Sequence, residues 1–274
     1  MHRICRLITV VLFVVGTLLA GVMPNASASP LLPRAMAATG DSITRAFNVG
    51  WCCVLRDEPS RSWSTGWSSL VDSHYRRLLP FDARLAGHAY NDAVSGARMG
   101  DLGSQVARAA SQRVDYLTIE MGANDLCRSS IAAMTPTLTF ETQFRTALAS
   151  FVAARPKARI LVASIPDVYR LWQLFHTNLV AVATWTAAGI CQSMLSISNT
   201  ETMRQQVVAQ ETAYNDALAR VCAEFRQCRW DGGAVYKFQF TTGDVSTVDY
   251  FHPSTQGQND LAAVTWAAGY WPTL

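Results

Sequence analysis

The sequence is poor in charge, and the charges that it has do not cluster. Only 16% of the 274 residues are Asp, Glu, Lys or Arg, and the formal net charge is +3. Lysine occurs only at Lys157 and Lys237, and the arginines are spread along the chain without forming a basic tract. Nucleic-acid-binding proteins gather basic residues on one face or helix, so the composition argues against that class of partner. The 50% hydrophobic content also argues against intrinsic disorder.

Long apolar runs are missing except near the N-terminus. Two arginines precede an uncharged apolar stretch at residues 7–23, and Ala26-Ser27-Ala28 follows as a small-residue cleavage site. This pattern predicts a secretory signal peptide over residues 1–28 and a mature domain over residues 29–274. An uncleaved membrane anchor is the alternative, because about 17 apolar residues lie near the lower limit for a span. We therefore expect a secreted protein, extracellular or in the cell envelope, with no stable membrane span after cleavage.

Paired CxxC spacings are also absent, although the chain contains seven cysteines. Six of them follow the expected signal peptide, and an even number in an exported chain indicates disulfides. A zinc site is the alternative, but neither CxxC pairs nor nearby histidines support it. Cys52 and Cys53 are adjacent, and a bond between neighbours would be strained and reducible, so their pairing stays open.

The remaining four cysteines suggest two bonds. Cys222 and Cys228 would close a short loop at the end of a helix, which makes them the first pair that we expect. Cys127 with Cys191 is the second pair. Six cysteines permit 15 pairings in all, and the sequence alone does not choose among them.

Expected strands alternate with expected helices along the mature chain. Strands are predicted at residues 35–39, 81–89, 115–121, 159–165 and 235–240. Helices are predicted at residues 67–79, 100–112, 140–154, 200–225 and 255–268. Alternation of this kind is the signature of a parallel sheet with crossover helices. We expect one α/β domain.

Three motifs with chemically active side chains follow this pattern. Gly40-Asp41-Ser42 comes directly after the first expected strand, and Gly122-Ala123-Asn124-Asp125 follows the third. The carboxyl ends of parallel strands meet at one edge of a sheet, so Ser42 and Asn124 can share a crevice there. Asp249 stands three residues before His252, a spacing that lets a carboxylate orient an imidazole. Each motif alone is common, but their joint order indicates a nucleophilic site.

These residues resemble the SGNH hydrolases, also called GDSL esterases and lipases, from Gly40 to the last helix. The resemblance implies a three-layer α/β/α sandwich around a five-stranded parallel sheet, as in flavodoxin-like folds. It implies that Ser42 is the nucleophile, that His252 is the base and that Asp249 is the acid. The GxSxG elbow of the α/β-hydrolases is absent, which excludes that larger esterase class.

The resemblance also implies an oxyanion hole built by Ser42, Gly96 and Asn124. Gly96 lies in the turn-forming segment at residues 91–97, whose context fits the family better than the nearby Gly100 or Gly103. Cys127 is an alternative nucleophile in principle, but we expect it to be disulfide-bonded.

The expected function is ester hydrolysis through an acyl-serine, on lipid or other carboxylic esters. The alternatives are a carbohydrate acetyl esterase and a non-catalytic secreted binding protein with the same fold. Residues 169–195 are rich in aromatic and aliphatic side chains, so they form either an apolar wall or lid for an acyl chain or a buried crossover helix. Trp51, Trp63 and Trp67 either line a sugar-binding cleft or pack in the core. No cofactor or metal is implied, and we expect a monomer.

Overall fold

The computed structural model describes residues 31–274. The expected signal peptide and its cleavage site lie outside the described residues. Within residues 31–274, no helix is long and apolar enough to cross a membrane.

The described chain is built around a five-stranded parallel sheet with the strand order β2-β1-β3-β4-β5. The strands are β1 (Met36–Gly40), β2 (Ala89–Asn91), β3 (Tyr116–Glu120), β4 (Arg159–Val162) and β5 (Cys228–Trp230). The three central strands are almost completely buried, as strands of a parallel sheet covered on both faces are. The expected three-layer fold with a five-stranded parallel sheet is confirmed.

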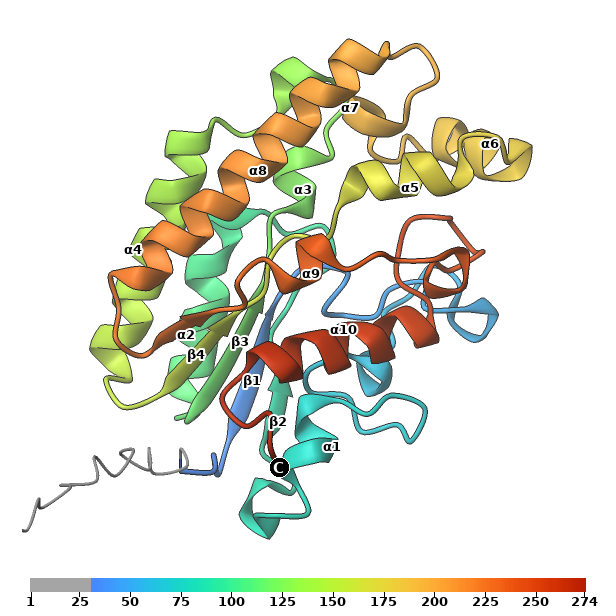
Figure 1. The fold of residues 1–274 in the computed structure, drawn as a ribbon. Helices are drawn as coiled ribbons and strands as arrows, with labels where there is room; N and C mark the ends of the chain where they lie inside the picture. The colour runs from blue at the N-terminus through green and yellow to red at the C-terminus, as the bar shows by residue number, and fades with distance from the viewer. Residues whose placement is uncertain (1–30) are drawn as a thin grey trace, which may run out of the picture.

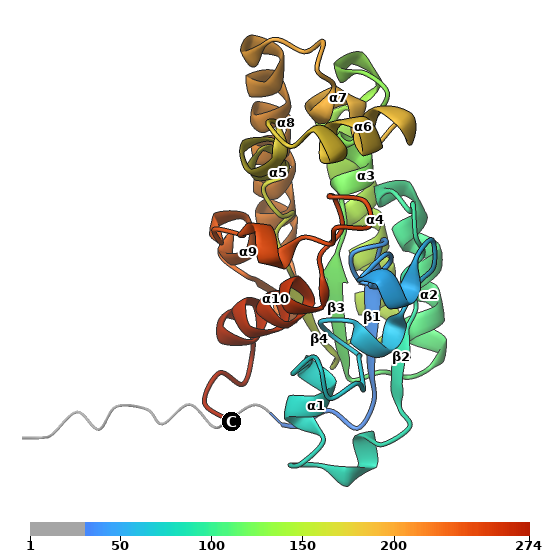
Figure 2. The ribbon, with the colours of Figure 1, turned by 90° about the vertical axis from the view of Figure 1, so that its right-hand side faces the viewer.

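Helices cover both faces of this sheet (Figure 1; Figure 2). They are α1 (His74–Leu78), α2 (Leu102–Ser111), α3 (Ala123–Leu126), α4 (Thr137–Ala154), α5 (Val168–Phe175), α6 (Leu179–Ala187), α7 (Gln192–Leu195), α8 (Glu201–Ala223), α9 (Ala234–Lys237) and α10 (Thr255–Ala268). Leu117 and Ile119 point from β3 into the larger core, which α2, α4 and α8 complete. Tyr116 points to the opposite face and packs with residues of α1 and α10. The two-residue alternation of β3 therefore separates two helical layers.

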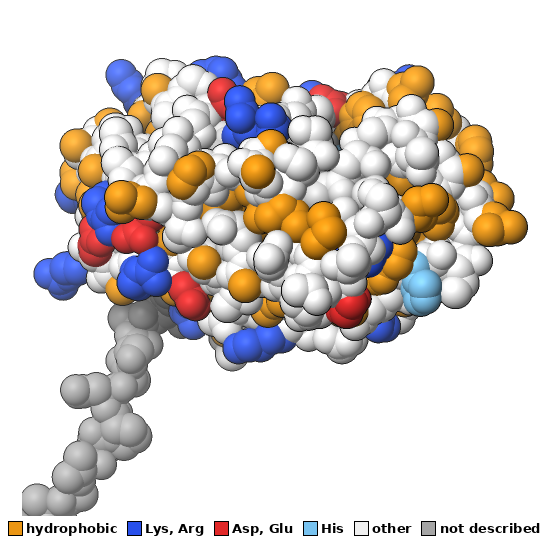
Figure 3. All heavy atoms as spheres, turned by 90° about the horizontal axis from the view of Figure 1, so that it is seen from above, with side chains coloured by type: hydrophobic (Ala, Val, Ile, Leu, Met, Phe, Trp, Pro, Cys, Tyr) orange, Lys and Arg blue, Asp and Glu red, His pale blue; other side chains and the backbone are white. Residues whose placement is uncertain are grey.

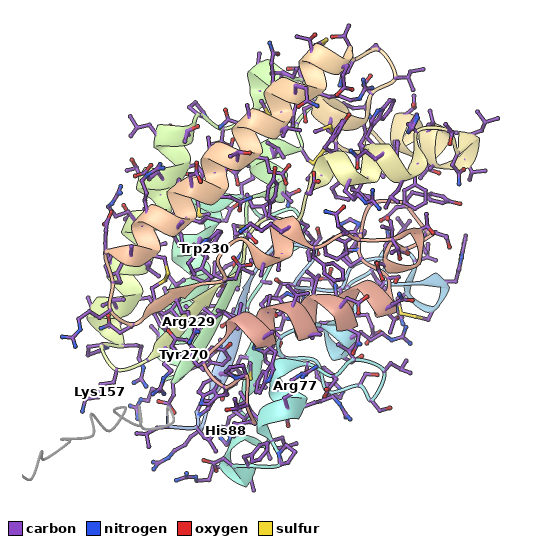
Figure 4. The ribbon with its side chains drawn as sticks, viewed as in Figure 1. Arg77, His88, Lys157, Arg229, Trp230 and Tyr270 are labelled. Carbon is purple, nitrogen blue, oxygen red and sulfur yellow. A yellow bond between two sulfur atoms is a disulfide. The ribbon has the colours of Figure 1, made fainter. Side chains whose placement is uncertain are left out.

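The C-terminal segment packs against the amino ends of the strands. The Tyr270 hydroxyl donates to the carbonyl oxygens of Ile160 (3.1 Å) and Gln227 (2.7 Å). The Arg229 guanidinium lies 5.6 Å from the centroid of the Tyr270 ring, and Figure 4 shows the two side chains beside each other. These contacts are at the end of the sheet opposite to Ser42.

Two expected strands are wrong because the edge strands are only three residues long. Residues 81–89 contain a 3-10 turn capped by Asp82, and β2 begins only at Ala89. Residues 235–240 include part of α9, which follows a left-handed Gly232-Gly233 pair, and the fifth strand lies earlier, at β5.

Two expected helices also differ from the structure. Residues 67–73 form turns, bends and irregular backbone instead of a helix. Helix α1 begins at His74, and the Ser73 side chain caps it by accepting a hydrogen bond from the Arg76 amide. Residues 169–195 do not form one buried crossover helix, because the segment is divided into α5, α6 and α7, and most of α6 is exposed.

Residues 31–274 contain three disulfides, and they join Cys52 to Cys53, Cys127 to Cys191 and Cys222 to Cys228. The last two are the pairs that the sequence favours. Cys127–Cys191 ties the end of α3 to the turn before α7 across 64 residues, whereas Cys222–Cys228 closes only six. A longer closed loop removes more entropy from the unfolded chain.

We predict that the Cys127→Ala/Cys191→Ala variant loses about 4 kcal/mol of unfolding free energy. Loop closure predicts a loss of about 2 kcal/mol for Cys222→Ala/Cys228→Ala. Urea unfolding of both double variants and the parent measures the difference. A larger loss from the six-residue loop would contradict this explanation of the stability.

A buried carboxyl group ends the central strand β3. Glu120 is 1% exposed, and no group among residues 31–274 hydrogen-bonds to either of its carboxyl oxygens. Burial, reinforced by the nearby Asp41 charge, raises the pKa of the Glu120 carboxyl well above its ordinary value. The folded state therefore keeps a proton that the unfolded chain releases above about pH 4.3, and stability decreases as pH rises through the folded-state pKa.

We predict that Glu120→Gln loses less unfolding free energy than the parent between pH 5 and 8, because the neutral amide has no proton to release. Urea titrations across that range test this. Equal losses in both proteins would show that burial of Glu120 does not contribute to the pH dependence.

Candidate active site

Ser42 lies two residues beyond β1, at the carboxyl edge of the sheet. Its position depends on Gly40, the last residue of that strand. Gly40 has φ of +147°, and a Cβ there would lie 2.1 Å from the Glu120 carbonyl oxygen, so only glycine fits. The Gln105 side chain binds both backbone groups of Gly40, accepting from its N–H (2.8 Å) and donating to its carbonyl (2.9 Å). The Asp41 carboxylate accepts the Ile43 N–H at 2.9 Å and so braces the turn that carries Ser42.

His252 lies between Ser42 and Asp249. Its Nε2 is 2.8 Å from the Ser42 hydroxyl oxygen, and its Nδ1 is 2.6 Å from Oδ2 of Asp249. The other carboxylate oxygen of Asp249 accepts the backbone N–H groups of Phe251 and His252, both at 3.0 Å. The three-residue spacing therefore forms a tight turn in which one carboxylate fixes both the backbone and the ring of His252.

The environment of Asp249 favours its charged form. Burial alone raises the pKa of this carboxyl, but hydrogen bonds from His252 and Asn48, with the imidazole charge, together hold the pKa below its ordinary value. A charged Asp249 accepts a hydrogen bond from the Nδ1–H of His252, which leaves Nε2 free to accept the Ser42 proton.

Asn124 is the second residue of α3, which begins at Ala123 directly after Gly122. Its amide nitrogen donates to the Ala97 carbonyl oxygen (3.1 Å) and to Oδ2 of Asp41 (3.3 Å). Burial raises the pKa of the Asp41 carboxyl to about 6, against the lowering effect of the Ile43 N–H. These contacts hold the Asn124 amide beside the turn that carries Ser42.

The structure brings Gly96 to the same cleft. This glycine has φ of +82° in the loop after β2, and it lines a cleft of about 290 Å³ with Ser42, Asn124 and His252. Gly100 and Gly103, the alternatives from the sequence, line other surface depressions.

The structure shows which further side chains line the cleft and support its catalytic groups. The Cys127–Cys191 disulfide lines one side, so Cys127 is not a free thiol and the alternative cysteine nucleophile is wrong. Ile190 from the turn before α7 lies on the same wall. Asn48, which hydrogen-bonds to Asp249, belongs to no recognisable motif because the two residues are 201 positions apart.

The tryptophans do not line the cleft that holds Ser42. Trp63 is buried in the core, whereas Trp51 and Trp67 are exposed. Core packing, one of the two roles considered for these residues, therefore applies to Trp63.

Comparisons with known proteins agree with this geometry. A family model described as GDSL-like Lipase/Acylhydrolase matches residues 36–264. Membrane-associated phospholipase B1 of Rattus norvegicus is 24% identical over 221 residues, which are 69% of this chain and 15% of that protein. The chain thus spans only a small part of this curated relative.

Solved structures show the same fold at low sequence identity. An acetylxylan esterase from Geobacillus stearothermophilus matches with a TM-score of 0.51 and 16% identity, covering 85% of this chain and 93% of that one. Phospholipase A1 from Streptomyces albidoflavus NA297 has the same TM-score and identity, with 86% and 99% covered. Because the family model covers most of the chain, the protein belongs to the GDSL-like lipase/acylhydrolase family.

Proposed function

We propose that the protein is a carboxylic ester hydrolase and that Ser42, His252 and Asp249 form its catalytic triad. The observation that carries the proposal is the position of His252, whose two ring nitrogens lie 2.8 Å from the Ser42 oxygen and 2.6 Å from the Asp249 oxygen. A nucleophile, a base and a group that orients the base, all within hydrogen-bond reach, are the requirements for serine catalysis.

The reaction has two halves. His252 Nε2 takes the Ser42 proton as the serine oxygen attacks the ester carbonyl, and the imidazolium then gives that proton to the departing alcohol. In the second half, Nε2 takes a proton from water as the water oxygen attacks the acyl-serine carbonyl. The bond between the acyl carbon and the Ser42 oxygen then breaks, the imidazolium returns its proton to that oxygen, and the carboxylic acid is released. The charge of Asp249 stabilises the imidazolium that is present in both halves.

The negative oxygen of each tetrahedral intermediate needs donors. We assign the backbone N–H groups of Ser42 and Gly96 and the side-chain amide of Asn124 to this role. Asn124 is held firmly by Ala97 at 3.1 Å, and its contact with Asp41 is longer, at 3.3 Å. An oxyanion can therefore take the place of Asp41 as acceptor for the Asn124 amide at a lower cost than it could take the place of the Ala97 carbonyl oxygen.

The cleft beside Ser42 supports a lipid ester or another ester with an apolar acyl group as substrate. Phe47, Ile190 and Phe251 line it together with the Cys127–Cys191 disulfide. Seen from the carboxyl ends of the strands, hydrophobic side chains gather toward the side of the molecule where α5 and α6 lie (Figure 3). The turn after α6 thus serves as the acyl wall considered from the sequence.

Export of the protein is part of the same proposal. Three disulfides are characteristic of oxidising compartments, and the apolar stretch at residues 7–23 has the pattern of a signal peptide.

Ser42→Ala is expected to remove hydrolysis of p-nitrophenyl butyrate while the thermal unfolding midpoint stays near that of the parent, because the hydroxyl is the nucleophile. The exposed Ser111→Ala is the matched control and should keep parental turnover. Equal turnover in the Ser42 variant and the parent would refute the triad and favour a non-catalytic binding protein.

Ile190→Asn is expected to lower kcat/KM for p-nitrophenyl octanoate about tenfold more than for the acetate, because only the longer chain reaches this wall. The comparison uses initial rates across acyl lengths. Val180→Asn, an exposed change on α6, is the control. A parent that prefers acetate, with equal losses for both esters in the variant, would contradict the apolar wall.

A further inference from the structure

The catalytic segment at residues 246–252 is held by a second segment at residues 47–56, which the reaction scheme above does not use. The Trp51 indole N–H donates to the Thr247 hydroxyl at 3.1 Å. The Phe47 ring contacts the His252 ring edge-on, with 5.1 Å between the centroids. The segment therefore borders both the base and the acid of the proposed triad.

Within this segment, Asn48 makes the direct contact with the acid. Its side-chain amide nitrogen lies 2.6 Å from Oδ2 of Asp249. The same oxygen accepts the hydrogen bond from Nδ1 of His252, also at 2.6 Å. Asn48 is only 3% exposed, and Asp249 is 5% exposed, so water has little access to compete for this oxygen.

The orientation of the Asn48 amide is fixed by its other end. Its Oδ1 accepts the backbone N–H of Leu55 at 2.6 Å, and a backbone N–H requires an acceptor there. The amide nitrogen must consequently be the atom that faces Asp249. Donation to a carboxylate oxygen favours the charged form of that carboxylate.

The backbone of Asn48 fits the same arrangement. Its φ is +51°, in the left-handed region that glycine and asparagine tolerate better than other residues. Its own N–H donates to the Arg56 carbonyl oxygen at 3.2 Å, which closes the segment on itself. Asparagine thus meets two requirements at once: the backbone conformation and a neutral donor beside a buried carboxylate.

We propose that Asn48 is a positioning residue for the acid of the triad: its amide holds Oδ2 of Asp249 in place for the hydrogen bond from His252. This inference rests on the proposed triad. Asn48 acts through Asp249 and touches no reacting atom, so its loss lowers turnover without changing how substrate binds. A residue that only shaped the loop would have no effect on the His252–Asp249 hydrogen bond once the loop is folded.

Two variants separate these roles. Asn48→Gly keeps the left-handed backbone and removes the amide. Asn48→Asp keeps the acceptor for the Leu55 N–H but places a second carboxylate against Asp249. Asn215→Ala is the control, because Asn215 is also a buried asparagine, with its side-chain oxygen accepting a backbone N–H, that of Ile165, at 2.9 Å.

At pH 8, we expect Asn48→Gly to lower kcat about 10- to 100-fold, the range for losing a hydrogen bond to a charged group, with KM within about twofold of the parent. Asn48→Asp should lower kcat at least as much, because two adjacent carboxylates repel. Asn215→Ala should keep parental kcat. Parental kcat in both Asn48 variants, or a loss that appears in KM alone, would overturn the proposal.

A readout independent of activity completes the test. The proton that His252 Nδ1 donates to Asp249 is followed as a far-downfield ¹H NMR signal, assigned by its loss in His252→Ala. We expect that signal in the parent and in Asn215→Ala, and a shifted or lost signal in folded Asn48→Gly and Asn48→Asp. An unchanged signal in both Asn48 variants overturns the positioning role. The signal does not depend on ester turnover, so failure of the proposed triad, detected with Ser42→Ala, is distinguishable from failure of this inference.

Discussion

The close approach of two backbones at the ends of β1 and β3 is the constraint on which the site depends. Gly40 is paired with Glu120 in the parallel register, and a side chain at Gly40 would collide with the Glu120 carbonyl oxygen. Ser42 and Asn124 therefore emerge from adjacent strands within a few residues of that contact. The Asp41 side chain, which accepts from both Ile43 and Asn124, links the two turns.

Acidic groups have different roles at different depths of this site. Glu120 is buried beneath it without hydrogen-bond partners among the described residues, so its neutral form is favoured. Asp249 is also buried, but donors from His252 and Asn48 favour its charged form. Burial raises the pKa of both carboxyls, so the opposite net shifts come from their neighbours: hydrogen-bond donors and the imidazole charge lower the pKa of Asp249, whereas the Asp41 charge raises that of Glu120 further.

Sequence patterns predict the parts of this protein that depend on local signals. The sequences of β3 and of helix α10 have clear strand and helix patterns, and both elements lie close to their expected bounds. The predicted positions of the two edge strands are wrong because β2 and β5 have only three residues each, too few to show the two-residue alternation of a strand. The local spacing of Asp249 and His252 also anticipates their contact.

Contacts between distant segments leave no such signal. Asn48 meets Asp249 only because the segment after β1 folds against the loop before α10, and neither stretch alone indicates this. Ile190 lies in the apolar stretch at residues 169–195, but the sequence does not single it out. It reaches the cleft because that stretch is divided into three short helices and is tied to α3 by the Cys127–Cys191 bond. Local motifs thus locate the reacting groups, whereas the surroundings that tune them require the structure.

The most direct test of the account is to locate the residue that a serine-reactive fluorophosphonate modifies in the folded protein. Peptide mass spectrometry of the labelled chain should place a single adduct on Ser42, and the His252→Ala variant should label far more slowly, because the base no longer takes the serine proton. An adduct on another residue, or equal labelling in the two proteins, would contradict the assignment of Ser42 and His252 as nucleophile and base.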